Sequence, residues 1–310
     1  MDEGKISITP TEQEGSDRRH LWHGLIFLAT GLFMLGIYGV GDGPMPGGGE
    51  SAAGDSLSFG LLAAIGMIAG SLFMFLGGKR FFAGNSVVVE YYEAIFMAVG
   101  IALLLRTFVI EPFKIPSGSM IPTLLVGDYL FVSKLAYGHR IPFSRERMFM
   151  KNGPKRGDVA VFEYPQDPRK DYIKRIVGLP GDRVTYHNKR LHLNGEPVGY
   201  EAMGQFSYKN EHGQEVESLR LAEKLPGPTG GEAVSHPILV RPFSYADITD
   251  TVVPPGHYFV MGDNRDNSND SRAWGFVPAY RLVGEALVIF WSWDNQGGGL
   301  RWERLGQSVK

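Results

Sequence analysis

Two serines in a short, stiff turn are the residues of this sequence best suited to nucleophilic chemistry. The segment 115–125 reads IPSGSMIPTLL and holds Ser117 and Ser119. Pro116 and Pro122 stiffen its two sides, because a proline ring fixes the backbone φ. A rigid turn that presents a hydroxyl beside free backbone N–H groups suits acyl transfer. The same composition is also typical of an ordinary turn.

A base must accompany such a serine, since the hydroxyl is a poor nucleophile until its proton is removed. A lysine can serve only when loss of solvation lowers its pKa from about 10.4 toward 7 or 8. In the segment 171–178, DYIKRIVG, strand alternation places Lys174 on one face with Tyr172 and Ile176. Arg175 points to the other face, where a carboxylate could pair with it. A lysine on a solvated strand face remains the alternative interpretation.

Histidine is the more usual base, and this possibility stays open. A triad of Ser119, His257 and Asp263 is conceivable from the order of the residues. A zinc site is disfavoured, because His187 and His192 lack the usual spacing of zinc ligands.

The polar segment 262–278, GDNRDNSNDSRAWGFVP, is predicted to form a hydrogen-bonded loop that supports a site. Calcium is a competing interpretation, since Asp263, Asp266 and Asp270 supply oxygen donors. The spacing of an EF-hand is absent, and the interleaved arginines would repel a cation.

Composition narrows the function classes. The 310-residue chain contains no cysteine, which excludes a thiol nucleophile, a disulfide framework and a cysteine-based zinc site. Its formal net charge is -2 and it has no long basic block, so nothing favours nucleic-acid binding.

The apolar residues crowd into the first third of the chain, which predicts a membrane anchor. The runs 21–41 and 56–78 contain no Asp, Glu, Lys or Arg, and about 20 apolar residues cross a bilayer. A third predicted span, 91–110, carries Glu93 and Arg106 near its ends, where charges reach the headgroups. A buried helix of a soluble domain is the alternative for this third segment.

The basic residues set the orientation. The tail, residues 1–20, carries three Lys or Arg and the loop after the second span carries two, whereas the loop 42–55 carries none. By the positive-inside rule the tail is cytoplasmic, and residues 111–310 lie on the outer side. The apolar run 21–41 is longer than that of a cleaved signal peptide, so a retained anchor is favoured.

Short runs of β-branched and aromatic residues follow, bounded by Gly, Pro and Asp, and they predict a mostly β domain. The dipeptide Asn194-Gly195 predicts a tight hairpin turn. An insertion at about 183–256 is polar and rich in turns, and no chemistry is assigned to it. No helical periodicity is evident after Ile110. The expected strands are 129–135, 158–164, 171–178, 184–188, 190–193, 257–261 and 286–293.

Five blocks, in this order along the chain, closely resemble type I signal peptidase, the membrane-bound serine protease of bacteria. The resemblance covers most of the outer domain outside the insertion. The blocks are 116–124, 127–138, 155–165, 171–182 and 262–278.

The resemblance implies transmembrane helices followed by packed antiparallel sheets, and removal of N-terminal signal peptides from exported preproteins. Cleavage would follow small residues in an Ala-x-Ala pattern, at the outer face of the bacterial cytoplasmic membrane. Signal peptides, the lipid bilayer and the export machinery are the implied partners. No cofactor, metal or nucleic acid is implied.

The same resemblance assigns roles to individual residues. Ser119 would be the nucleophile and Lys174 the general base, neutral at rest. The Ser119 N–H and the Ser117 hydroxyl would form the oxyanion hole. Ser268 would hydrogen-bond the Lys174 amine and orient it. Two ion pairs, Asp270 with Arg272 and Arg175 with Asp263, would support the site. The residues implied to line the substrate pockets are Ile115, Pro116, Met120, Leu124, Tyr172 and Ile173.

Two other functions remain as alternatives. One is a non-catalytic membrane protein that binds signal peptides, although the presence of Ser119 and Lys174 favours an enzyme. The other is a specialised Ser/Lys peptidase with one dedicated substrate.

Overall fold

A computed structural model describes residues 110–140, 147–148, 153–210, 213–227, 233–241, 247–294 and 297–310, with scattered residues between 94 and 109. The chain divides into two compact units, and the one described below contains Arg106–Lys310. The predicted spans 21–41 and 56–78 and the tail lie outside the described residues. In the part of the chain that is described, no helix has both the length and the apolar character needed to cross a membrane.

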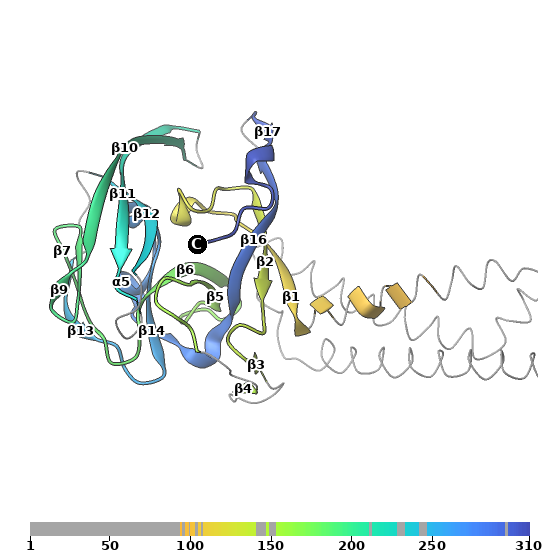
Figure 1. Cartoon of the computed structure of the whole chain (residues 1–310), viewed down its shortest axis with the longest axis horizontal. Coiled ribbons are helices and arrows are strands. Elements are labelled where there is room, and N and C mark those ends of the chain that lie inside the picture. Colours follow the sequence, from red (N-terminus) through yellow and green to blue (C-terminus); the bar gives the residue numbers. More distant parts are fainter. Residues whose placement is uncertain are drawn as a thin grey trace, which may run out of the picture. The chain divides into compact units, whose positions relative to one another are not determined.

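The main sheet of the described domain has eight strands, and every pairing in it is antiparallel (Figure 1). The strand order is β1-β2-β16-β5-β6-β14-β15, with β17 paired to β16. The strands are β1 (Ile110–Lys114), β2 (Asp128–Ser133), β5 (Val159–Glu163), β6 (Asp171–Gly178), β14 (His257–Met261), β15 (Val277–Pro278), β16 (Leu282–Asp294) and β17 (Gly299–Leu300).

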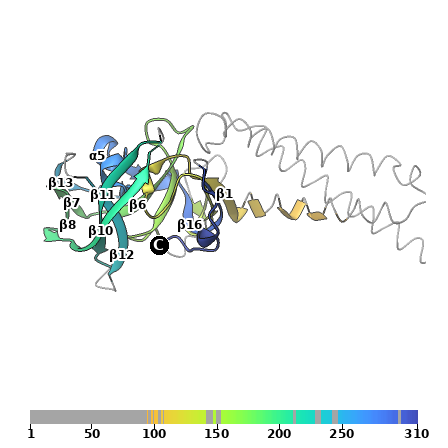
Figure 2. The same cartoon turned by 90° about the horizontal axis from the view of Figure 1, so that it is seen from above.

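The predicted insertion forms two smaller sheets, which both views place at the end of the domain opposite β1 (Figure 1 and Figure 2). One has the order β13-β7-β8-β9 and the other β10-β11-β12. Their bounds, with those of a separate hairpin β3-β4, are β3 (His139–Arg140), β4 (Arg147–Met148), β7 (Arg183–His187), β8 (Arg190–Leu193), β9 (Glu196–Pro197), β10 (Gly199–Lys209), β11 (Glu215–Leu225), β12 (Val234–Val240) and β13 (Ile248–Val252).

Helix is scarce in the described residues from Ile110 onward, as the sequence predicted. The α-helix α5 (Ser271–Trp274) has four residues. Short 3-10 helices η2 (Gly118–Met120) and η4 (Arg265–Asn267) lie in the serine turn and in the polar segment after β14. Two more, η5 (Ala279–Arg281) and η6 (Trp302–Arg304), flank β16.

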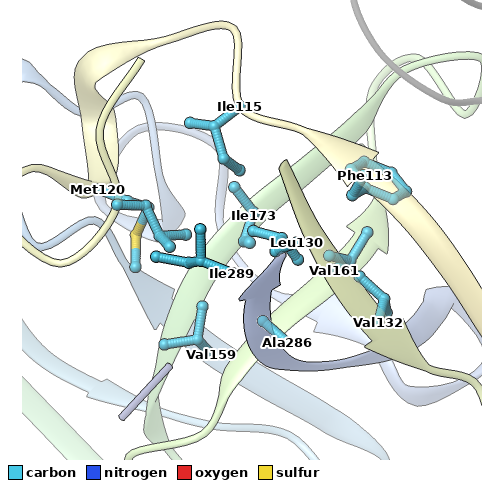
Figure 3. Packing of buried hydrophobic residues seen from close by; sticks show 11 residues of the cluster. Phe113, Ile115, Met120, Leu130, Val132, Val159, Val161, Ile173, Ala286 and Ile289 are labelled. Carbon is cyan, nitrogen blue, oxygen red and sulfur yellow. The ribbon is translucent and has the colours of Figure 1, made fainter. Parts of the chain in front are cut away.

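Strand alternation builds the core that supports the serine turn. In β2, buried and partly exposed side chains alternate along the whole strand. Its inward residues join others from β1, β5, β6 and β16 in one hydrophobic cluster (Figure 3). Ile115 and Met120, which bracket the two serines, belong to this cluster. The turn is therefore fixed at both ends by apolar burial.

Candidate active site

Ser119 and Lys174 lie in direct contact. The Lys174 Nζ is 2.6 Å from the Ser119 Oγ, and it also donates to the Ile173 carbonyl oxygen at 2.9 Å. Ser119 is 8% exposed and Lys174 is 4% exposed. Lys174 belongs to β6, which pairs with β5 on one side and β14 on the other. A central strand thus holds the amine, while the turn after β1 holds the hydroxyl.

Burial gives Lys174 the protonation behaviour of a base. Loss of solvation lowers the pKa of its amine from 10.5 to about 8, against the opposing effect of the Asp270 and Asp263 carboxylates. The Tyr172 ring, whose centroid is 5.4 Å from Nζ, covers the amine. A fraction of Lys174 is therefore neutral near pH 7, the state in which an amine can accept a proton.

Donors for an oxyanion lie beside the nucleophile. The Ser117 Oγ is 3.4 Å from the Ser119 Oγ. Among the described residues, the Ser119 N–H has no hydrogen-bond acceptor. The hydroxyl and the N–H therefore lie side by side as two donors next to the nucleophile.

Asn264 holds the serine turn in place. Its backbone N–H donates to the Ser119 carbonyl oxygen at 3.0 Å, and its side-chain Nδ2 donates to the Gly118 carbonyl oxygen at 3.0 Å. Gly262 allows this close approach, because a Cβ there would lie 2.5 Å from the Ser119 carbonyl oxygen. Asn264 was not singled out in the sequence, where only its place in a dense polar segment pointed to it.

Two buried ion pairs support the site, and both were predicted. Arg175 binds Asp263 through Nε–Oδ1 at 2.9 Å and Nη2–Oδ2 at 2.7 Å. Arg272 binds Asp270 through two contacts of 2.8 Å. Burial alone would raise the pKa of either carboxyl, but the paired arginine holds it below the usual range. Both carboxylates stay charged and fix the segment that follows β14.

Ser268 differs from the prediction. It lines the same cavity as Ser119 and Lys174, but its buried Oγ forms no hydrogen bond with the Lys174 amine. The amine reaches the Ile173 carbonyl of its own strand instead. The carbonyl oxygen of Ile173, the residue before Lys174, accepts a hydrogen bond from the amine, whereas the Ser268 hydroxyl does not.

A cavity of about 590 Å³ opens beside the nucleophile. Three of the predicted substrate residues line it, namely Pro116, Tyr172 and Ile173. Three others, Ile115, Met120 and Leu124, are at most 1% exposed and pack in the core cluster (Figure 3). Their apolar side chains are stabilised by that burial, so they form the core under the turn rather than the cavity wall.

Comparisons with known proteins identify the family. The family model described as signal peptidase, peptidase S26, matches residues 88–291. The signal peptidase I of Pseudomonas fluorescens is 45% identical over 222 residues, which cover 67% of this chain and 74% of the relative. That of Pseudomonas aeruginosa is 44% identical over 222 residues, with the same coverage. The chain belongs to the S26 signal peptidase family.

Among solved structures, a signal peptidase I from Enterococcus faecalis is 27% identical, with a TM-score of 0.26. The match covers 43% of this chain and 97% of that chain.

As a member of this family, the chain is a signal peptidase, a hydrolase that removes signal peptides. The match confirms the family predicted from the five sequence blocks. The fold agrees in its coarse form, a mostly β domain of antiparallel sheets. The membrane helices of the prediction are not tested by the described residues.

The histidine alternative is wrong for this peptidase. His257 Nδ1 is 2.9 Å from the Pro255 carbonyl oxygen, and the ring is at the start of β14. Asp263, its supposed partner, is bound to Arg175. Among the described residues, no hydrogen bond joins His257 to Ser119.

The three acidic residues considered for calcium are held by cations of the peptidase itself. Asp263 and Asp270 are bound by arginines, and Asp266 is bound by Lys189. Each carboxylate is therefore a structural anchor of the segment after β14. Among the described residues, no group of three His, Asp or Glu is placed to hold a metal ion.

Asp171, which the sequence did not single out, also lines the cavity of the peptidase. Burial, together with the negative charges of Glu111 and Glu163, raises the pKa of its carboxyl to about 9. It is neutral at pH 7 and can donate a hydrogen bond. The cavity wall at the start of β6 is thus less acidic than its sequence indicates.

Proposed function

We propose that this chain is a serine endopeptidase with a Ser119/Lys174 dyad, which releases exported preproteins from their signal peptides by cutting after small residues. The observation that carries this proposal is the buried 2.6 Å contact between Lys174 Nζ and Ser119 Oγ, with the pKa of the amine lowered to about 8. A lysine in this state can act as the base that the nucleophile needs.

The first half of the reaction is acylation. Lys174 takes the proton of the Ser119 hydroxyl while the Oγ attacks the carbonyl carbon of the residue at −1. The oxyanion accepts hydrogen bonds from the Ser119 N–H and the Ser117 hydroxyl. When the C–N bond breaks, the leaving amine takes the proton from Lys174 and becomes the new N-terminus of the mature protein. The signal peptide stays bound to Ser119 as an ester.

Deacylation runs through the same groups. Lys174 removes a proton from water, and the resulting nucleophile attacks the ester carbonyl. The C–O bond breaks, Ser119 Oγ regains its proton from Lys174, and the signal peptide leaves with a free carboxylate. No group beyond this chain and water is needed to balance either step.

The surroundings of the nucleophile support a preference for small side chains at −1 and −3. Pro116, Tyr172 and Ile173 form an apolar wall, and the core under the turn is close-packed, with Met120 and Leu124 fully buried. A pocket reaching below the turn would have to displace this core, which is energetically costly, so the subsites stay shallow.

The membrane location is part of the same proposal. The apolar runs 21–41, 56–78 and 91–110 and the distribution of Lys and Arg support three spans, a cytoplasmic N-terminus and a catalytic domain on the outer side. The lipid bilayer and the export machinery would then be neighbours of the site, and the emerging signal peptide its substrate.

The test is cleavage of three unrelated preproteins with Ala-x-Ala sites by the full chain in detergent. We expect cleavage after the −1 alanine, with rates at least about 10³-fold lower for Ser119→Ala and Lys174→Met. N-terminal sequencing of the products identifies the bond that is cut. Near-normal rates for folded Lys174→Met would contradict the dyad, and cleavage of one preprotein alone would favour a dedicated peptidase.

A further inference from the structure

Three consecutive residues behind the serine turn are each bound by residues of the insertion. The first is Asn264, which is fully buried and holds the turn through its two bonds to Gly118 and Ser119. Its side-chain Nδ2 also donates to the hydroxyl of Tyr208 at 2.8 Å. Tyr208 lies near the end of β10, so a strand of the insertion reaches the residue that holds the nucleophile.

The second residue is Arg265, which forms a bidentate ion pair with Glu223 of β11. Both side chains are at most 2% exposed. The hydroxyl of Tyr200 in β10 donates to the same carboxylate at 2.8 Å. Burial works against ionisation of Glu223, but Arg265 holds the pKa of this carboxyl well below its usual range. The pair is charged and rigid.

The third residue is Asp266. The Lys189 Nζ contacts both of its carboxylate oxygens at 2.8 Å. The backbone N–H of Arg241 donates to Oδ2 at 2.5 Å, and the Arg241 side chain donates to the Asp266 carbonyl oxygen at 2.6 Å. Lys189 precedes β8 and Arg241 follows β12, so segments far apart within the insertion converge on one residue.

We propose that the inserted strands are a positioning element of the active site, and that Tyr208 is a positioning residue which orients Ser119 through Asn264. This inference rests on the proposed Ser119/Lys174 mechanism. It assigns a role to the insertion, which the sequence left without one.

The chemistry of the Asn264 amide explains the assignment. An amide nitrogen carries two hydrogens, and here one is directed to the Gly118 carbonyl and one to the Tyr208 hydroxyl. If the amide rotated by half a turn, its oxygen would face the Gly118 carbonyl oxygen and repel it. The Gly118 carbonyl therefore selects this orientation, and the Tyr208 hydroxyl, which accepts the second N–H, limits movement of the amide away from it. Displacement of the nucleophile by about 1 Å can lower a rate about 100-fold.

The test is Tyr208→Phe in the full chain, with Tyr186→Phe as a matched control. Tyr186 also belongs to the insertion and is 1% exposed, but its hydroxyl has no hydrogen-bond partner among the described residues. Each variant loses one hydroxyl and keeps its ring. The assay is steady-state cleavage of a synthetic peptide with Ala at −3 and −1, with the melting temperature measured in the same detergent.

We expect Tyr208→Phe to lower kcat about three- to tenfold, as the loss of one orienting hydrogen bond does. KM, the melting temperature and the pH at half-maximal kcat should stay at wild-type values, and Tyr186→Phe should match wild type throughout. Lys189→Met, which loosens Asp266 independently, should lower kcat in the same way. A fall in kcat with unchanged KM and melting temperature separates positioning from general stabilisation.

Two results would overturn the inference. One is wild-type kcat in both Tyr208→Phe and Lys189→Met. The other is a fall in kcat that the control shares or that a lower melting temperature accounts for. Failure of the proposed function would be seen separately, as an inactive wild type or an active Ser119→Ala in the same assay.

Discussion

Lys174 is expected to lower the stability of the folded chain at neutral pH, so replacing it by methionine should stabilise the protein. The pKa of this amine is about 8 in the folded state, against an ordinary value of 10.5, which we take for the unfolded chain. Between these two pH values the unfolded chain binds more protons than the folded chain. The free energy of unfolding therefore rises with pH across this window. At pH 7, below both pKa values, it is lower by the full free energy that corresponds to the pKa difference.

The magnitude follows from the difference between the two pKa values. Each pKa unit corresponds to about 1.4 kcal/mol, so Lys174 lowers the free energy of unfolding at pH 7 by about 3 kcal/mol. Lys174→Met removes this penalty, but it also removes the contacts with Ser119 Oγ and the Ile173 carbonyl, worth about 1 kcal/mol each. The net expectation at pH 7 is a gain of about 1 to 2 kcal/mol.

The assay is urea unfolding of the full chain in detergent, followed by circular dichroism at pH 7 and pH 10. The difference between Lys174→Met and wild type should fall by about 2 to 3 kcal/mol between the two pH values, because at pH 10 Lys174 is neutral in the folded wild type and close to its ordinary pKa of 10.5 in the unfolded chain. The exposed Lys209, substituted as Lys209→Met, is the control and should show no such change. A difference that is equal at pH 7 and pH 10 would refute the reasoning.

Three further substitutions test the neighbours of the dyad. Ser117→Ala should lower kcat about 10²-fold with little change in KM, because an oxyanion donor acts only in the transition state; an equal rise in KM would contradict this role. Gly262→Ala should lower kcat more than about 10²-fold in a folded protein, since the new Cβ would meet the Ser119 carbonyl at 2.5 Å; wild-type kcat would show that the turn tolerates displacement. Asp263→Asn should lower the free energy of unfolding by about 3 to 5 kcal/mol, because it leaves Arg175 buried without a charged partner. Replacing Arg175 by methionine in the same chain should restore part of the lost stability. Chemical denaturation of the single and double variants tests this, and a double variant no more stable than Asp263→Asn would contradict it.

Local patterns in the sequence predicted several strands, including β6, which carries Lys174, but not β1, which precedes the serine turn. The runs 171–178, 190–193 and 257–261 coincide with β6, β8 and β14, because burial on a pleated surface selects β-branched and aromatic residues. The Asn194-Gly195 turn is also confirmed, with φ of 56° and 87°. Arg175 was expected to meet a carboxylate, which alternation along a strand makes predictable.

Features that depend on distant parts of the chain were not predictable in this way. Strands β10 and β11 have 11 residues each, and most side chains of β10 are exposed, so little burial marks it as a strand. The role of Asn264 depends on carbonyls of the serine turn, far away in the sequence. The Ser268 hydroxyl was expected at the Lys174 amine, but no hydrogen bond joins the two, and the amine donates to the Ile173 carbonyl oxygen instead.

The most direct test of the central claim is the pH dependence of kcat/KM for a peptide with Ala at −3 and −1, measured from pH 6 to pH 10. If neutral Lys174 is the base, kcat/KM rises with pH and levels off above a pKa of about 8. A rise that ends near 6.5, the ordinary value for histidine, or a rate that does not change with pH, would contradict the dyad.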